Sequence, residues 1–117
     1  PLNVKDMKAG LDWAGNSGKL IANLLFKSEC IGEAYTVSTA QGLTWGQVAD
    51  LYTEILGTKF EWVPADFPHD AWHWRYDRAY DRPVDNSKIL AATGLKPADF
   101  KSIREGIEIE LRKLGAI

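Results

Sequence analysis

The stretch TWGQVADLYTEILG (residues 44–57) predicts the best-defined helix of the chain. Thr44 is followed three residues later by Gln47, the pattern of a capping box, in which both side chains bond to free backbone N–H groups. Gly57 stands where a left-handed residue commonly ends a helix. The apolar face between these signals consists of Trp45, Val48, Leu51, Tyr52 and Ile55. We therefore expect an amphipathic helix that packs through this face.

Three short stretches around this helix have the composition of β-strands. Glu33 to Ser38 and Lys59 to Val63 alternate in character and are rich in β-branched or aromatic residues. Leu2 to Val4 is a shorter strand candidate at the start of the chain. We therefore expect three short strands.

Two helices are expected between the strand candidate Leu2 to Val4 and the strand candidate Glu33 to Ser38. Asp6 can cap a helix over Met7 to Trp13, because a carboxylate accepts hydrogen bonds from a first helical turn. The stretch Gly15-Asn16-Ser17-Gly18 is expected to break the chain. The apolar residues after it have helical spacing and predict a second helix of about two turns. These residues are Leu20, Ile21, Leu24 and Leu25.

Two more helices are expected after residue 84. Asp85 or Asn86 can cap a helix over Ser87 to Thr93, and Gly94 can end it. Pro97 and Asp99 are expected to begin the last helix, and Gly115 to end it. The apolar face of this helix consists of Phe100, Ile103, Ile107, Leu111 and Leu114. Together these elements predict a small mixed α/β (α+β) domain, with a few short strands packed against about four to five helices.

Length, composition and charge limit the class of protein. The 117 residues fit one domain, and 45% apolar with 26% charged residues is typical of a globular chain. The net charge of −2 argues against binding nucleic acid through bulk charge. The sequence has no apolar run long enough to span a membrane and no signal peptide pattern. We therefore expect a cytoplasmic protein without nucleic-acid or membrane partners.

Several familiar motifs are absent or incomplete. Gly15-Asn16-Ser17-Gly18-Lys19 resembles a phosphate-binding loop, but Trp13 stands where its first glycine must be and Leu20 where Ser or Thr must follow. The sequence contains no G-x-G-x-x-G motif and no Tyr followed four residues later by Lys. We therefore expect no catalytic and no cofactor-binding residue in this chain.

Metal and thiol chemistry have little support in the sequence. His69 and His73 stand four residues apart, a spacing found in some zinc sites, but no Glu follows the first histidine. Interface histidines are the better interpretation, so no metal site is expected. Cys30 is the only cysteine and is expected to be a small buried apolar residue.

The segment from Trp72 to Arg82 is the most unusual part of the sequence. Arginine can bind a phosphate or carboxylate through two hydrogen bonds, and aromatic rings offer flat surfaces for a base or sugar. The candidate substrate-binding residues of the segment are Arg75, Arg78, Arg82, Trp74 and Tyr76. Asp77 and Asp81 partly cancel the charge, so a second interpretation is a loop held by internal Arg–Asp pairs.

Several stretches, taken together, resemble the C-terminal part of the NAD-dependent epimerase/dehydratase family, the extended short-chain dehydrogenases. The first three are Leu2-Asn3-Val4-Lys5-Asp6-Met7, Ile31-Gly32-Glu33-Ala34-Tyr35-Thr36-Val37, and Leu43-Thr44-Trp45 with the helix end Ile55-Leu56-Gly57. The others are Asp85-Asn86-Ser87-Lys88, Thr93-Gly94-Leu95-Lys96-Pro97 and Ile103-Arg104-Glu105-Gly106-Ile107. They follow the family's order over nearly the whole chain. Leu95 departs from the pattern, which commonly has Trp there.

The resemblance implies that residues 1–117 form the substrate-binding C-terminal domain, a fragment of a longer enzyme. The parent enzyme would bind NAD or NADP in an N-terminal Rossmann domain that also carries the catalytic Tyr and Lys, so this chain alone would be inactive. Its substrate would be a nucleotide sugar or a related carbonyl or hydroxyl compound. In relatives that act on nucleotide sugars, an arginine shortly before the Asp-x-Ser-Lys stretch binds the diphosphate. Arg75, Arg78 and Arg82 occupy that region.

Two residues of the matched stretches have structural roles in this interpretation, with Asp85 as a helix cap and Lys88 as a cation that either lies on the surface or holds a loop. An alternative is a free-standing ligand-binding or protein-interaction module that uses residues 72–82. A third interpretation has the exposed rings covering the missing domain or forming a homodimer contact.

Overall fold

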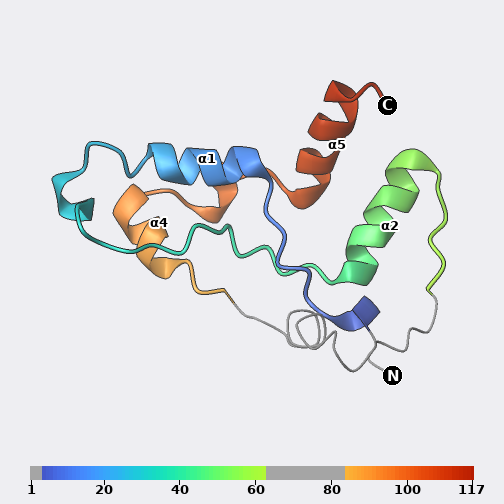
Figure 1. The fold of residues 1–117 in the computed structure, drawn as a ribbon, viewed down its shortest axis with the longest axis horizontal. Coiled ribbons are helices and arrows are strands. Elements are labelled where there is room, and N and C mark those ends of the chain that lie inside the picture. Colours follow the sequence, from blue (N-terminus) through green and yellow to red (C-terminus); the bar gives the residue numbers. More distant parts are fainter. Residues whose placement is uncertain (1–3, 63–83) are drawn as a thin grey trace, which may run out of the picture. The chain divides into compact units, whose positions relative to one another are not determined.

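The structure is a computed structural model that describes residues 4–62 and 84–117 (Figure 1). Within them lie four α-helices, which are α1 (Ala14–Ala22), α2 (Trp45–Leu56), α4 (Ser87–Thr93) and α5 (Ile103–Lys113). Single turns of 3-10 helix occur at Val4–Asp6, Ser28–Cys30 and Pro97–Asp99.

The chain divides into two compact units. In the described residues, the first unit consists of 4–10 and 42–62 and contains α2, and the second consists of 11–41 and 84–117 and contains α1, α4 and α5. The prediction of a single substrate-binding domain over residues 1–117 stays a prediction.

The prediction of a mixed α/β fold is wrong. The described residues form no β-ladder, and their isolated bridge joins Lys8 and Thr44. Residues 33–39 run extended without a described partner strand, and Ala40 ends this extended segment with a left-handed φ of 55°. Residues 59–62 have no regular structure. Alternating side chains favour an extended backbone, but a strand also requires the hydrogen-bonding edge of a second one. Leu2, Asn3 and Val63 lie outside the described residues, and Val4 begins a 3-10 turn instead of ending a strand.

The first two predicted helices are also wrong in place. Residues 7–13 are not helical, and α1 runs straight through the expected break at Gly15–Gly18. Burial overrides the low helix propensity of these glycines, because Asn16 and Leu20 on this helix are 2% and 0% exposed. The aromatic ring of Trp13 also lies against Gly15, where a larger residue would clash. Leu24 and Leu25 follow the end of α1 instead of extending its face.

The helix predicted over residues 44–57 is confirmed as α2. Thr44 and Gln47 form the capping box, with the Gln47 backbone N–H 3.2 Å from Thr44 Oγ1 and the Thr44 N–H 2.9 Å from Gln47 Oε1. Gly57 ends the helix with a φ of 69°. Val48 and Ala49 are its buried apolar residues. In the same unit, the Tyr52 ring meets the Phe60 ring edge-on, with 6.4 Å between the ring centres.

The prediction for Ser87–Thr93 is confirmed as α4, which Gly94 ends at a φ of 72°. The last helix begins later than expected, because Pro97–Asp99 forms a separate 3-10 turn. Ser102 is the true N-cap of α5 and forms a capping box with Glu105. Phe100 therefore lies before the helix, and Leu114 at its end is 79% exposed.

Hydrogen bonds between side chains and the backbone stabilise the second unit, together with a small apolar core. Its buried apolar side chains are Leu20, Ile89 and Ile103. The Asn16 side chain donates to the Lys101 carbonyl at 2.8 Å and accepts from the Lys101 N–H at 3.0 Å. The Gln41 side chain repeats this pattern, donating to Lys101 O at 2.9 Å and accepting from the Ile103 N–H at 3.0 Å. The residues before α5 are thereby tied to α1 and to the extended segment.

The carboxylate of Asp12 fixes the end of the extended segment. It accepts hydrogen bonds from Ser38 Oγ at 2.6 Å, from the Thr39 N–H at 3.0 Å and from the Thr39 hydroxyl. The Asn86 amide donates to the Ser38 carbonyl at 3.1 Å, so the same segment passes beside the start of α4 (Figure 1). These bonds replace the strand pairing that the sequence predicted.

Candidate functional site

The five residues predicted to bind substrate lie outside the described residues. They are Arg75, Arg78, Arg82, Trp74 and Tyr76, and His69 and His73 lie there too. The structure therefore leaves their proposed roles as predictions.

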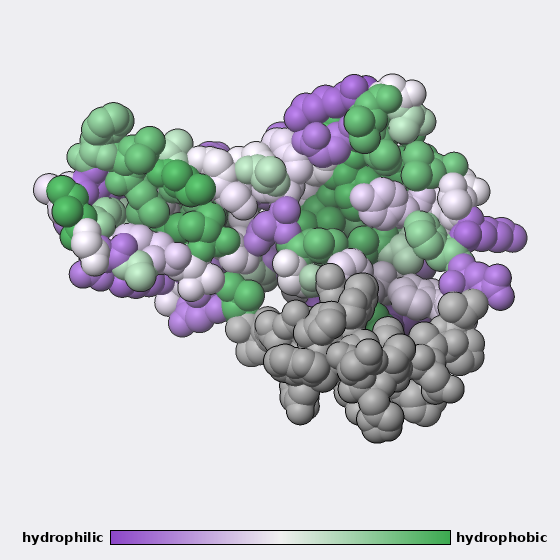
Figure 2. All heavy atoms as spheres, viewed as in Figure 1, coloured by the Kyte–Doolittle hydropathy of each residue, from purple (hydrophilic) through white to green (hydrophobic). Residues whose placement is uncertain are grey.

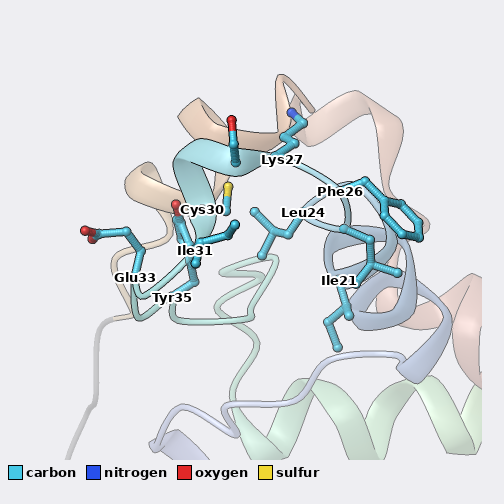
Figure 3. A pocket seen from close by; sticks show the side chains of 10 residues that line it. Ile21, Leu24, Phe26, Lys27, Cys30, Ile31, Glu33 and Tyr35 are labelled. Carbon is cyan, nitrogen blue, oxygen red and sulfur yellow. The ribbon is translucent and has the colours of Figure 1, made fainter.

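The second unit contains a pocket of about 470 Å³ at the C-terminal end of α1 (Figure 3). The chain leaves α1, turns at Phe26, passes through the 3-10 turn Ser28–Cys30 and returns in extended form after Gly32. Its apolar lining consists of Ile21, Leu24, Leu25, Phe26 and Ile31. Figure 3 shows Leu24, Cys30 and Ile31 around a common space, with Phe26 at one end and Glu33 at the other.

Lys88 organises the polar end of this pocket. Its ammonium lies 2.8 Å from Glu33 Oε2 and 3.0 Å from the Ala34 carbonyl, and 4.9 Å from the centre of the Tyr35 ring. The hydrogen bond and charge of Lys88 lower the pKa of the Glu33 carboxyl. The ion pair is therefore formed at neutral pH, and Lys88 has the loop-holding role, one of the two roles that the sequence left open. Both side chains are about half exposed, so the pair contributes little stability.

Tyr35 and Cys30 supply a hydroxyl and a thiol to the pocket lining. A hydrogen bond with the Cys30 side chain, together with partial desolvation, raises the pKa of Tyr35 to about 12. The hydroxyl therefore stays protonated at physiological pH. Cys30 is half-buried, so the prediction of a buried apolar cysteine is wrong. This pair can donate and accept hydrogen bonds but carries no charge from the tyrosine.

The lysine in the pocket lining, Lys27, has a hydrogen-bond partner. Lys27 Nζ donates to the Ala92 carbonyl near the end of α4 at 2.6 Å. The two charged residues of the lining, Lys27 and Glu33, are thus both engaged with protein groups.

Asp85 has the capping role that the sequence predicts. Its Oδ1 accepts from the Ser87 backbone N–H at 2.9 Å, and this bond lowers the pKa of the Asp85 carboxyl. Asn86 occupies the N-cap position but makes no side-chain cap bond.

The sequence analysis missed the pocket. The spacing of Ile21 and Leu25 predicts a helix, whereas in the structure these side chains line the pocket and are 48% and 57% exposed. The available signal was the uninterrupted apolar run Leu24-Leu25-Phe26 just before Lys27, which exceeds what one face of a short helix can bury.

Two absences hold for the described residues. Residues 4–62 and 84–117 contain no group of three or more His, Cys, Asp or Glu side chains arranged to hold a metal ion. In the same part of the chain, every helix is too short or too polar to cross a bilayer.

In comparisons with known proteins, no family model, curated protein or solved structure matches this chain.

Proposed function

We propose that this chain is the substrate-binding part of an NAD(P)-dependent epimerase, dehydratase or reductase. The order of the sequence stretches that resemble this family supports the proposal. The parent protein would act in the cytoplasm on a nucleotide sugar or a related carbonyl or hydroxyl compound.

One contact carries the proposal furthest. Lys88 belongs to the Asp85–Lys88 stretch of the resemblance, and Glu33 and Ala34 belong to the Ile31–Val37 stretch. Lys88 is 55 residues from Glu33 and 54 residues from Ala34 along the chain. Its ammonium nevertheless lies 2.8 Å from Glu33 Oε2 and 3.0 Å from the Ala34 carbonyl. Two of the stretches that carry the resemblance are thus in contact within the second unit.

The roles divide between this chain and the proposed Rossmann domain. That domain would bind NAD or NADP and carry the catalytic Tyr and Lys, since this sequence contains neither G-x-G-x-x-G nor the Tyr/Lys pair. Arg75, Arg78 and Arg82 would bind the diphosphate of the substrate, because guanidinium groups bond phosphate oxygens in pairs. Trp74 and Tyr76 would hold the base or sugar by stacking.

The arginines provide the test. We expect replacing Arg75, Arg78 or Arg82 by Gln in the complete natural protein to raise KM for nucleoside diphosphate sugars. At the residue that binds the diphosphate, loss of a charged hydrogen bond predicts an increase of about tenfold or more. KM and kcat would be measured by the change in nicotinamide absorbance across a panel of these sugars.

Arg112→Gln is the matched control, because this exposed arginine of α5 pairs only with Glu108 at 3.5 Å among its described contacts. We expect its KM to equal that of the wild type. If all three test variants stay within about twofold of this control, the arginines do not bind the substrate diphosphate. If the natural protein binds such sugars but binds and turns over no nicotinamide nucleotide, a free-standing ligand-binding module replaces the proposal.

A further inference from the structure

Apolar side chains gather on the surface around the pocket of the second unit. Ile31 is 82% exposed and Phe26 fully exposed, and Ile21 and Leu25 are about half exposed. Figure 2 shows apolar surface at the end of this unit where the chain turns after α1. Exposed apolar side chains that cluster beside a pocket commonly mark a binding site.

The backbone at Phe26 gives a second, independent observation. Its φ of 64° is left-handed, a conformation that L-residues other than Asn, Asp and Gly rarely adopt. The turn thus places a large apolar ring in solvent at a conformational cost, although glycine would make the same turn without that cost. Strained residues of this kind are concentrated at ligand-binding sites.

The size of the pocket and the charges of its lining indicate which class of ligand it can bind. A volume of about 470 Å³ lies within the range of small-molecule pockets. Lys27 is bonded to the Ala92 carbonyl and Glu33 to Lys88, so neither charged residue of the lining is left to pair with a charged ligand. The Tyr35 hydroxyl and the Cys30 thiol offer hydrogen-bonding groups in the lining.

We propose that this pocket binds a neutral, largely apolar small molecule with one polar group directed toward Tyr35 and Cys30, and that Phe26 covers its apolar part. This site uses none of the arginines of residues 72–82. It does not depend on the proposed dehydrogenase function, because binding can be measured on the chain alone without cofactor or turnover.

The test uses N-phenyl-1-naphthylamine, a neutral apolar dye whose fluorescence rises in apolar surroundings. We expect saturable binding of one dye per 117-residue chain. Phe26→Gly is expected to raise Kd about fivefold or more, because it removes the ring that covers the ligand. The same variant should leave Tm unchanged or raise it, because glycine relieves the left-handed strain. A loss of binding without a loss of stability is the signature of a ligand-binding role for Phe26.

Ile31→Gln and Leu114→Gln form a matched pair that does not depend on the turn. Both side chains are exposed isoleucine or leucine residues of the second unit, but only Ile31 lines the pocket. We expect Ile31→Gln to weaken dye binding about threefold or more and Leu114→Gln to leave Kd unchanged. Equal effects of the two variants would overturn the proposal, as would the absence of saturable binding to the wild type.

The solution mass at the same protein concentrations distinguishes a small ligand from a second copy of the chain. A monomer with and without dye supports the proposal. A dimer that the dye dissociates would overturn it, because the pocket would then be an interface between copies.

Discussion

Replacing Asn16 with alanine is expected to lower the free energy of unfolding by about 2 kcal/mol. The Asn16 side chain is 2% exposed and bonds both the N–H and the carbonyl of Lys101. Alanine leaves the N–H without this partner, whereas the carbonyl keeps its hydrogen bond from Gln41. An unpaired buried backbone group costs about 1–3 kcal/mol, and the lost side-chain volume adds to that cost. Urea unfolding of the 117-residue chain, followed by circular dichroism, measures the change.

Asn23→Ala is the control for this prediction. Asn23 lies at the C-cap of the same helix, and its amide donates at 2.9 Å to the Lys19 carbonyl in an exposed position. Water can replace that bond, so a loss of under about 0.5 kcal/mol is expected. If Asn16→Ala and Asn23→Ala lowered the free energy of unfolding by similar amounts, the hydrogen bonds between Asn16 and Lys101 would not be important for the stability of the unit.

The second large effect is expected at Gly106 in α5. A Cβ atom at this position would lie 2.7 Å from both Cβ and Cγ of Trp13, atoms close to the backbone that cannot swing aside. Gly106→Ala must therefore displace Trp13 and disturb its 2.9 Å hydrogen bond to Glu110. We expect a loss of about 1–3 kcal/mol, despite the better helix propensity of alanine. Urea unfolding and the change in tryptophan fluorescence measure it.

Gly18→Ala is the control, and we expect it to raise the free energy of unfolding instead of lowering it. Gly18 lies within α1, is exposed, and has no atom within 4 Å of an added Cβ. Helix propensity alone then applies and predicts a gain of about 0.5–1 kcal/mol. If Gly106→Ala also raised the free energy of unfolding, the close contact between Trp13 and Gly106 of α5 would be contradicted.

Local signals predicted the elements that depend on local chemistry. The capping box at Thr44 and the left-handed ends at Gly57 and Gly94 gave α2 and α4 correctly. These features need only residues within one or two helical turns, so spacing along the sequence is enough to identify them.

Long-range contacts decided the elements that the sequence placed wrongly. Gly15 and Gly18 have low helix propensity, so the sequence predicts a break there. The hydrogen bond between Asn16 and Lys101 and the burial of Leu20 keep α1 helical instead. Residues 33–38 have the pattern of a strand, but a strand also depends on a partner that no local pattern encodes. The pocket was missed for the same reason, since its lining joins the end of α1 with residues 30–35.

We propose that this chain serves a nicotinamide-dependent enzyme. The most direct test is the native mass of the natural protein, captured from its source with an antibody against this chain. A Rossmann domain adds roughly 150–200 residues. We therefore expect a chain about two to three times the 13.1 kDa of this one, with NAD or NADP bound. A natural chain of 13.1 kDa, or a longer chain without a nicotinamide nucleotide, would contradict the account.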